Sequence, residues 1–113
     1  MLELSEAQLK EINELEQRDF VRRVRDDLVA QFPRFASDPG LLERLEKAHE
    51  AAIAFGIHDG ELRVQFIEEE AWHPGLYKLG VTKVWLTKKG CYSPEQRWKD
   101  MRAMLLYWTL GED

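Results

Sequence analysis

The sequence contains a single cysteine, Cys91, among its 113 residues. One cysteine cannot form an internal disulfide and cannot by itself hold a zinc ion, so we expect neither kind of cross-link. No apolar run approaches the ~20 residues of a membrane-spanning helix, and none has the character of a secretory leader. We therefore expect one cytoplasmic domain, residues 1–113, that is held together by side-chain packing.

A concentrated positive charge is also missing. The chain carries 21 acidic and 16 basic side chains, which gives a net charge of -5, and only residues 78–113 have a basic excess. Phosphate binding needs a dense basic surface, and the candidates near the end of the chain are Lys83, Lys88, Lys89, Arg97, Lys99 and Arg102. We therefore expect no nucleic-acid partner, and the uneven charge favours docking of another protein.

The first helix has a complete start signal. Ser5 is a good N-cap residue, and Gln8 stands three residues later, where it closes a capping box. Pro33 disfavours helical backbone in the residue before it, so we expect the helix to run to about Phe32. Apolar residues recur at helical spacing and predict a buried face: Leu9, Ile12, Leu15, Phe20, Val24 and Leu28.

A second helix is predicted between a proline and a glycine. Asp38 precedes Pro39 in the order typical of an N-cap followed by the first helical residue. Gly56 stands where a left-handed residue ends a helix, and Ile57 follows it as the apolar contact of a Schellman motif.

The middle of the chain is less regular. His58 or Asp59 caps a third, shorter helix that we expect to fade within the acidic residues 68–70. Residues 71–92 form a packed connector, in which residues 81–88 favour a short helix that buries Val84 and Trp85. A strand is the alternative for these residues, because valine, threonine and tryptophan have strand propensity.

The final helix begins as clearly as the first. Ser93, Pro94 and Gln96 combine an N-cap, a first-turn proline and a capping-box partner, and the helix is expected to end near Leu110. Its apolar stripe consists of Trp98, Met101, Leu105 and Trp108. The sequence thus predicts an all-α, single-domain helical bundle of three main helices plus one or two short helices.

No set of residues predicts catalysis. His49, His58 and His73 include no pair at helical i, i+4 spacing, so we expect solvent-facing or capping roles rather than metal ligation. Consecutive carboxylates at residues 68–70 point about 100° apart on a helix and are expected to be a solvated helix end. Cys91 has no nearby histidine to activate it. We expect no enzyme activity, no cofactor and no metal.

Large aromatic side chains are abundant late in the chain. Tryptophan and tyrosine dominate the energetics of protein–protein interfaces. The candidate protein-binding residues are Trp72, Tyr77, Trp85, Tyr107 and Trp108. An apolar helical stripe of this size also favours a homodimer.

Four segments together carry a resemblance to a protein group. They are FVRRVRDDLVAQF at residues 20–32 before a proline, AAIAFGI at 51–57, RVQFIE at 63–68 and PEQRWKDM at 94–101. The chain resembles small bacterial helical proteins encoded beside toxin effectors of the type VI secretion system. That resemblance implies a non-enzymatic accessory chaperone, or adaptor, that helps to load an effector onto the secretion spike.

Two functions stay open from the sequence. The first is an adaptor or co-chaperone that holds an effector, a toxin or a larger chaperone through helix faces and exposed aromatic side chains. The second is an immunity protein that neutralises a cognate toxin, for which the acidic residues 61–70 would match a basic cleft. Rescue of cells from the toxin distinguishes the two.

Overall fold

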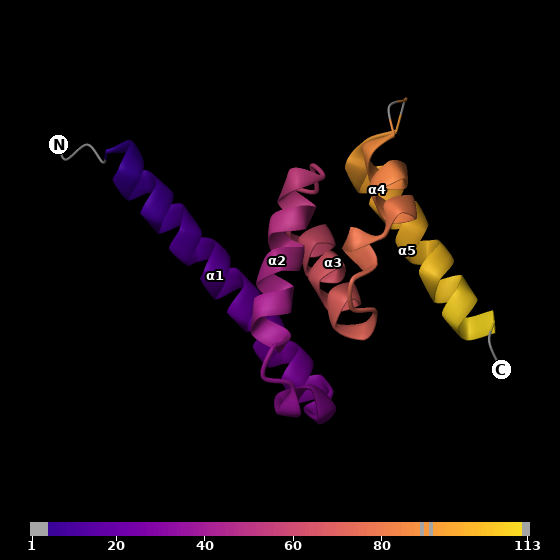
Figure 1. Ribbon diagram of the computed structural model, residues 1–113, viewed down its shortest axis with the longest axis horizontal. Helices are drawn as coiled ribbons and strands as arrows, with labels where there is room; N and C mark the ends of the chain where they lie inside the picture. Colours follow the sequence, from indigo (N-terminus) through magenta and orange to yellow (C-terminus); the bar gives the residue numbers. More distant parts are fainter. Residues whose placement is uncertain (1–4, 89, 91, 112–113) are drawn as a thin grey trace.

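The computed structural model describes the backbone of residues 5–88, 90 and 92–111, and the side chains as far as residue 106. Within these residues every regular element is a helix, which confirms the all-α class (Figure 1). The elements are α1 (Glu6–Gln31), the 3-10 helix η1 (Pro33–Ser37), α2 (Leu41–Ala54), α3 (Gly60–Trp72), the 3-10 helix η2 (Leu76–Lys78), α4 (Gly80–Thr87) and α5 (Pro94–Gly111).

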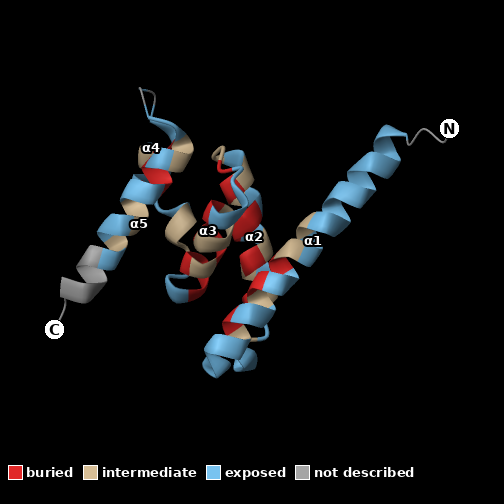
Figure 2. Ribbon diagram, turned by 180° about the vertical axis from the view of Figure 1, so that it is seen from behind, coloured by how far each residue is buried: buried red, intermediate tan, exposed pale blue. Residues whose placement is uncertain are grey.

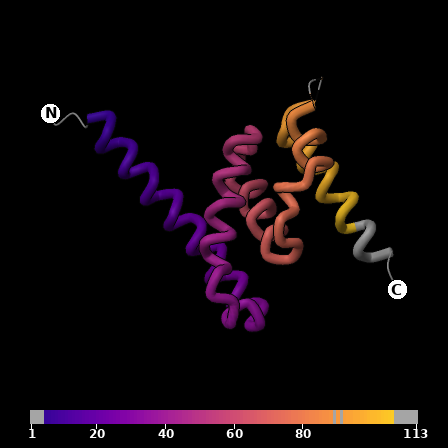
Figure 3. The backbone as a smooth tube through the Cα atoms, in the orientation of Figure 1, coloured from indigo at the N-terminus to yellow at the C-terminus, as the bar shows by residue number. Residues whose placement is uncertain are grey.

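The helices form a row. α2 and α3 lie side by side in the centre, α1 crosses one side of this pair, and α4 and α5 lie on the other side (Figures 1 and 3). The molecule measures 60 × 41 × 21 Å along its principal axes, so it is long and flat. The first turn of α1 and the α4–α5 pair therefore stand at opposite ends.

Two apolar clusters stabilise this row. The first joins α1 and η1 to the central pair and consists of Val21, Val24, Leu28, Phe35, Leu41, Leu45, Ile67 and Ala71. The second joins α4 and α5 to the same pair and consists of Ala48, Ala52, Ile57, Leu62, Phe66, Leu86 and Trp98. α2 and α3 each contribute to both clusters, because a central helix must bury two faces.

The start of α1 confirms the predicted capping box. The Ser5 hydroxyl accepts a hydrogen bond from the backbone N–H of Gln8 at 3.2 Å, and the Gln8 amide oxygen accepts one from the Ser5 N–H at 2.9 Å. α1 ends at Gln31, one residue before the predicted position. Each of the two hydrogen bonds between Ser5 and Gln8 satisfies a backbone N–H that would otherwise lack a partner at the start of α1.

Only the second half of α1 is packed. Residues 6–16, which we call the arm, are all exposed and extend away from the rest of the molecule (Figure 2). The apolar side chains of the arm are therefore in solvent: Leu9 is 53%, Ile12 41% and Leu15 58% exposed. The prediction that the whole apolar series of this helix faces a core is wrong for these three residues.

The predicted start of α2 is two residues too early. A 3-10 turn follows Pro33, and the Asp38 carboxylate accepts from the Gly40 N–H at 3.0 Å instead of capping the helix. The same carboxylate pairs with the Arg44 guanidinium at 3.1 Å. Gly40 is the N-cap and α2 begins at Leu41. Asp38 and Pro39, which we predicted to start the helix, form a turn before it.

The end of α2 confirms the predicted glycine. Gly56 has a φ of 91°, and the Ile57 N–H donates to the Ala52 carbonyl at 2.9 Å, as in a Schellman motif. A methyl group on Gly56 would lie 3.2 Å from the Pro94 Cγ atom of α5. The left-handed conformation and the close approach both require glycine here.

Replacing Gly56 with alanine should therefore lower the free energy of unfolding by about 1–2 kcal/mol. Gly60→Ala is the matched control, because a methyl group there meets nothing within 4 Å and its φ is not positive. Chemical denaturation of both variants measures the effect. Equal midpoints for the two variants would contradict this reading of the turn.

α3 is longer than predicted. The Asp59 carboxylate accepts from the Leu62 N–H at 3.1 Å and caps the helix as expected. The helix does not fade within residues 68–70 but continues to Trp72. Ile67 and Ala71 lie in the first apolar cluster, and their packing holds the last turns in helical form.

α4 and α5 settle the two remaining predictions of secondary structure. Residues 80–87 are helical, so the helix is confirmed and the strand alternative is wrong. α4 buries Thr82 and Leu86, whereas Val84, which we expected to be buried, is 68% exposed. At the start of α5 the Ser93 hydroxyl accepts from the Gln96 N–H at 3.1 Å, as predicted.

Candidate functional site

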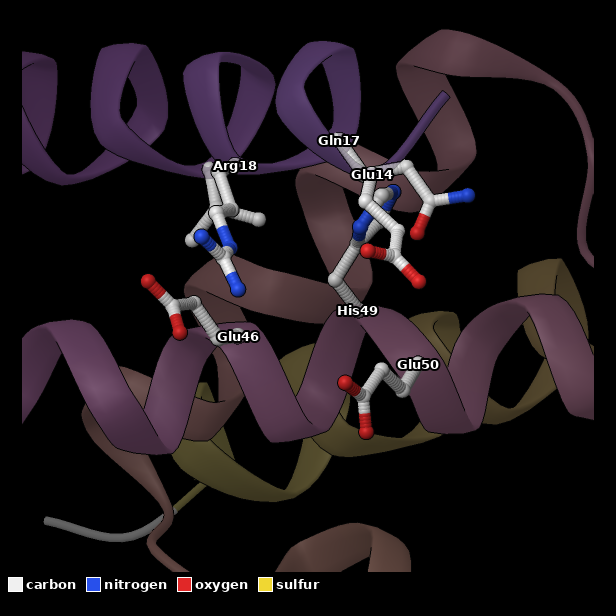
Figure 4. Close-up of a pocket in the computed structure, with 7 residues that line it drawn as sticks. Glu14, Gln17, Arg18, Glu46, His49 and Glu50 are labelled. Carbon is white, nitrogen blue, oxygen red and sulfur yellow. The ribbon is translucent and has the colours of Figure 1, made fainter. Parts of the chain in front are cut away.

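A polar pocket lies between α1 and α2. It encloses about 220 Å³ and is lined by Glu14, Gln17, Arg18, Val21, Glu46, His49 and Glu50 (Figure 4). His49 is 1% exposed, so the prediction of a solvent-facing or capping role is wrong for this residue. The His49 ring stacks on Phe20 with centroids 5.1 Å apart, and its Nε2 atom lies 3.1 Å from Nη1 of Arg63.

The surroundings of His49 keep its imidazole neutral. Burial, and secondarily the Arg63 guanidinium, lower the pKa of His49 to about 4. A neutral Nε2 can accept the hydrogen bond that Arg63 donates, whereas a protonated ring would place two cations together. Because that nitrogen already has a partner, it is not free to act as a base on a substrate. His49 therefore serves the packing of α1 against α2 and α3.

The described residues contain no metal-binding constellation. Nowhere in residues 5–88, 90 and 92–106 do three His, Cys, Asp or Glu side chains converge as a bound metal ion would need. Cys91 lies outside the described residues.

The acidic residues 68–70 are not the solvated helix end that we expected. Glu69 is 9% and Glu70 4% exposed. Glu69 pairs with His73 at 3.7 Å and with the Arg102 Nε atom at 3.8 Å. The Glu70 carboxylate accepts from the Gly75 N–H at 3.0 and 3.2 Å, and burial raises the pKa of this carboxyl. These two carboxylates organise the end of α3 and its connection to η2.

Trp72 and Tyr77, two of the predicted binding residues, lie apart from each other. Trp72 is 37% exposed and packs edge-on against Phe32 and Phe35, with ring centroids 4.8 and 5.1 Å away. The Arg34 guanidinium lies 4.4 Å from the Trp72 ring. Tyr77 is half-buried, and burial raises the pKa of its phenol. Most of their aromatic surface is used within the fold.

Trp85 is different because it is only partly buried and lines an apolar pocket. The indole N–H donates to the Arg97 carbonyl at 2.9 Å, and the Arg97 guanidinium lies 5.0 Å from the ring. These contacts fix the ring between α4 and α5. The side chains of Tyr107 and Trp108 lie outside the described residues, so their role stays a prediction.

An apolar groove runs between α4 and α5. It encloses about 530 Å³ and is lined by Val81, Thr82, Trp85, Met101, Met104 and Leu105. We call it the α4–α5 groove. Val81 is 74% and Met104 58% exposed, and Val84 beside them adds a third exposed apolar side chain. Soluble monomers seldom expose apolar side chains gathered in this way unless the surface is a binding site.

The segment that contains this groove has a net positive charge. Residues 76–106 carry 7 basic and 2 acidic side chains. Among the basic residues, Lys83, Lys88 and Lys99 are exposed and form no ion pair within the part of the chain that the structure describes. The groove is thus apolar and lies in a segment with a net positive charge.

Sequence reasoning found Trp85 as a binding residue and Met101 and Leu105 as part of an apolar stripe, but it did not combine them into one groove. It gave weight to large aromatic rings, whereas the structure adds Val81, Val84 and Met104 as exposed apolar side chains. A usable signal was present: Val81, Val84 and Trp85 follow i, i+3, i+4 spacing on a helix that buries Leu86 on another face.

No protein-family model matches the chain, and neither a curated protein nor a solved structure is detectably similar to it. In the described residues no helix combines the length and the apolar character that crossing a membrane requires.

Proposed function

We propose that the protein is a non-enzymatic adaptor or co-chaperone that binds an amphipathic helix of a partner protein in the α4–α5 groove. The observation that carries this proposal is the groove itself: an open apolar trough of about 530 Å³ in a segment with a net positive charge. An amphipathic helix lays its apolar face into such a trough and uses charged residues to set its orientation. The preferred partner helix is acidic beside its apolar stripe.

The residues of the groove suit a chaperone-like role. Met101 and Met104 have flexible, polarisable side chains that adapt to different partner surfaces. Trp85 supplies a ring held by its hydrogen bond to Arg97, and anchored rings of this kind contribute strongly to protein binding. The chemistry is therefore that of holding a polypeptide in the cytoplasm, with no cofactor.

The resemblance to accessory proteins of the type VI secretion system gives this proposal a specific form. In that form the partner is a secreted effector or its larger chaperone, and the groove holds a helix of that partner until loading. The sequence segments at residues 20–32, 51–57, 63–68 and 94–101 support this form.

An immunity role lacks a supporting feature among the described residues. The acidic segment that suggested it is partly turned inward, since Glu69 and Glu70 are almost fully buried. We therefore do not propose toxin neutralisation, and the experiment described next distinguishes it from the adaptor role.

Met104→Glu should weaken partner binding at least about tenfold, because it places a charge in the apolar groove. Ala103→Glu is the matched control: it adds the same charge to an exposed neighbouring position about 100° further around α5. The chain is co-expressed with the products of adjacent genes, and complexes are isolated by size exclusion and titrated.

A complex that survives Ala103→Glu and is lost with Met104→Glu supports the proposal. No complex with any adjacent product, or a complex indifferent to Met104→Glu, overturns it. If the chain protects cells from the toxicity of an adjacent effector, it is an immunity protein instead.

A further inference from the structure

We infer that the α4–α5 groove also binds the arm of a second copy of this chain, so that the protein associates with itself when no partner is present. The inference rests on the proposed function in one respect, because both treat the groove as a helix-binding surface. It adds the identity of one occupant.

The arm has the form of a groove ligand. Leu9, Ile12 and Leu15 follow one another at intervals of three residues, which places them on one stripe about 120° wide. The stripe spans about 9 Å along the helix axis, and the groove residues from Val81 to Trp85 span about 6 Å along α4. All three side chains are at least 41% exposed. Within the part of the chain that the structure describes, no other segment covers this stripe.

The charges of arm and groove are complementary. Residues 6–16 carry 4 acidic side chains and 1 basic side chain. Glu6 and Glu11 lie about 60° and 40° beyond the two edges of the apolar stripe, whereas Glu16 lies within its angular range. The segment that contains the groove, residues 76–106, has an excess of basic side chains, among which Lys83, Lys88 and Lys99 are exposed and have no ion pair among the described residues. Two arms would repel each other, so the charges favour arm-in-groove contact over arm-to-arm contact.

The arm cannot reach the groove of its own chain. α2 and α3 stand between them, and the arm extends from the opposite end of the row (Figures 1 and 3). An arm that occupies the groove must therefore come from another copy. Two antiparallel copies that exchange arms would form a closed dimer, and a head-to-tail arrangement would form longer chains.

The wild-type protein is first examined by sedimentation velocity over a range of concentrations. We expect association that increases with concentration and weakens at high salt, because the opposite charges of the arm and of residues 76–106 are largely exposed and salt screens them. A wild-type protein that stays monomeric at every concentration at low salt overturns the inference.

Two single variants then test the two sides of the contact. Ile12→Glu on the arm and Val84→Glu beside the groove should each raise the dissociation constant of self-association at least about tenfold. Both positions are exposed, so the fold should persist, which circular dichroism verifies. Ala7→Glu is the control, since it adds the same charge on the other side of the arm, about 140° from Ile12.

Mixing the two variants identifies the geometry. Ile12→Glu retains an intact groove and Val84→Glu retains an intact arm, so their mixture should associate although neither does alone. If Val84→Glu associates by itself, the contact is arm to arm. If Ile12→Glu associates by itself, it is groove to groove. Either result overturns the inference.

The inference and the proposed function can fail separately. Loss of self-association with Ile12→Glu, without any complex with an adjacent gene product, leaves the inference and removes the adaptor role. A partner complex that depends on Met104, formed by a chain that is always monomeric, leaves the adaptor role and removes the inference.

Discussion

Trp98→Ala should lower the free energy of unfolding by about 3–5 kcal/mol, the range typical of removing a large aromatic side chain from a core. Trp98 is 0% exposed, and its ring packs against Phe66 of α3 with centroids 4.8 Å apart. It is the α5 member of the second apolar cluster, which attaches α4 and α5 to the centre. The variant should therefore also loosen the groove.

Chemical denaturation measures this effect, with Trp98→Phe as the matched control. Phenylalanine keeps an aromatic ring and removes the indole N–H, which is buried without a hydrogen-bond partner among the described residues. We expect this control to cost about 1–2 kcal/mol, much less than alanine. A Trp98→Ala variant as stable as Trp98→Phe would show that the ring does not join α5 to the rest of the fold.

Acidification from pH 7 to pH 5 should destabilise the protein by about 2 kcal/mol through His49 alone. The pKa of His49 is lowered by burial to about 4 in the folded chain, whereas it has its ordinary value of 6.5 when the chain is unfolded. In this window the unfolded chain takes up a proton that the folded chain does not. The contribution of the neutral His49 to the free energy of unfolding is therefore fully present above pH 6.5 and is lost as the pH falls toward 4.

His49→Gln is the control for this window, because its amide oxygen can still accept a hydrogen bond from Arg63 and has no proton to gain. The raised pKa values of Glu68 and Glu70 act in the opposite direction, and they act equally in both proteins. The difference between wild type and His49→Gln in denaturation midpoint across pH 5–7 thus isolates His49. Parallel pH profiles would contradict a buried, neutral imidazole.

The local features of the fold could be predicted because they depend on a few neighbouring residues. The capping box of Ser5 and Gln8, the Ser93 cap and the left-handed Gly56 each follow from the conformational needs of a helix end. The Asp38 prediction failed for the same local reason. Its carboxylate satisfied the turn before the helix, a competition that sequence spacing does not decide.

The features that involve distant residues could not be predicted. Helical spacing indicates which side chains of α1 share a face, but not that α2 covers only the half beyond residue 16. His49 is polar and reads as a surface residue, yet Phe20 of α1 and Arg63 of α3 enclose it. The groove arises from the way α4 lies on α5, so Trp85 was predicted as a binding residue without its neighbours.

The sharing of α2 and α3 by both apolar clusters sets an order of opening. Losing either central helix removes both clusters, whereas losing α1 or the α4–α5 pair removes only one. Fluctuations of the native state should therefore begin at the two ends of the row, where the arm and the groove lie. Recognition and local ordering are then energetically linked, and occupation of either surface should slow amide exchange throughout the helices that carry it.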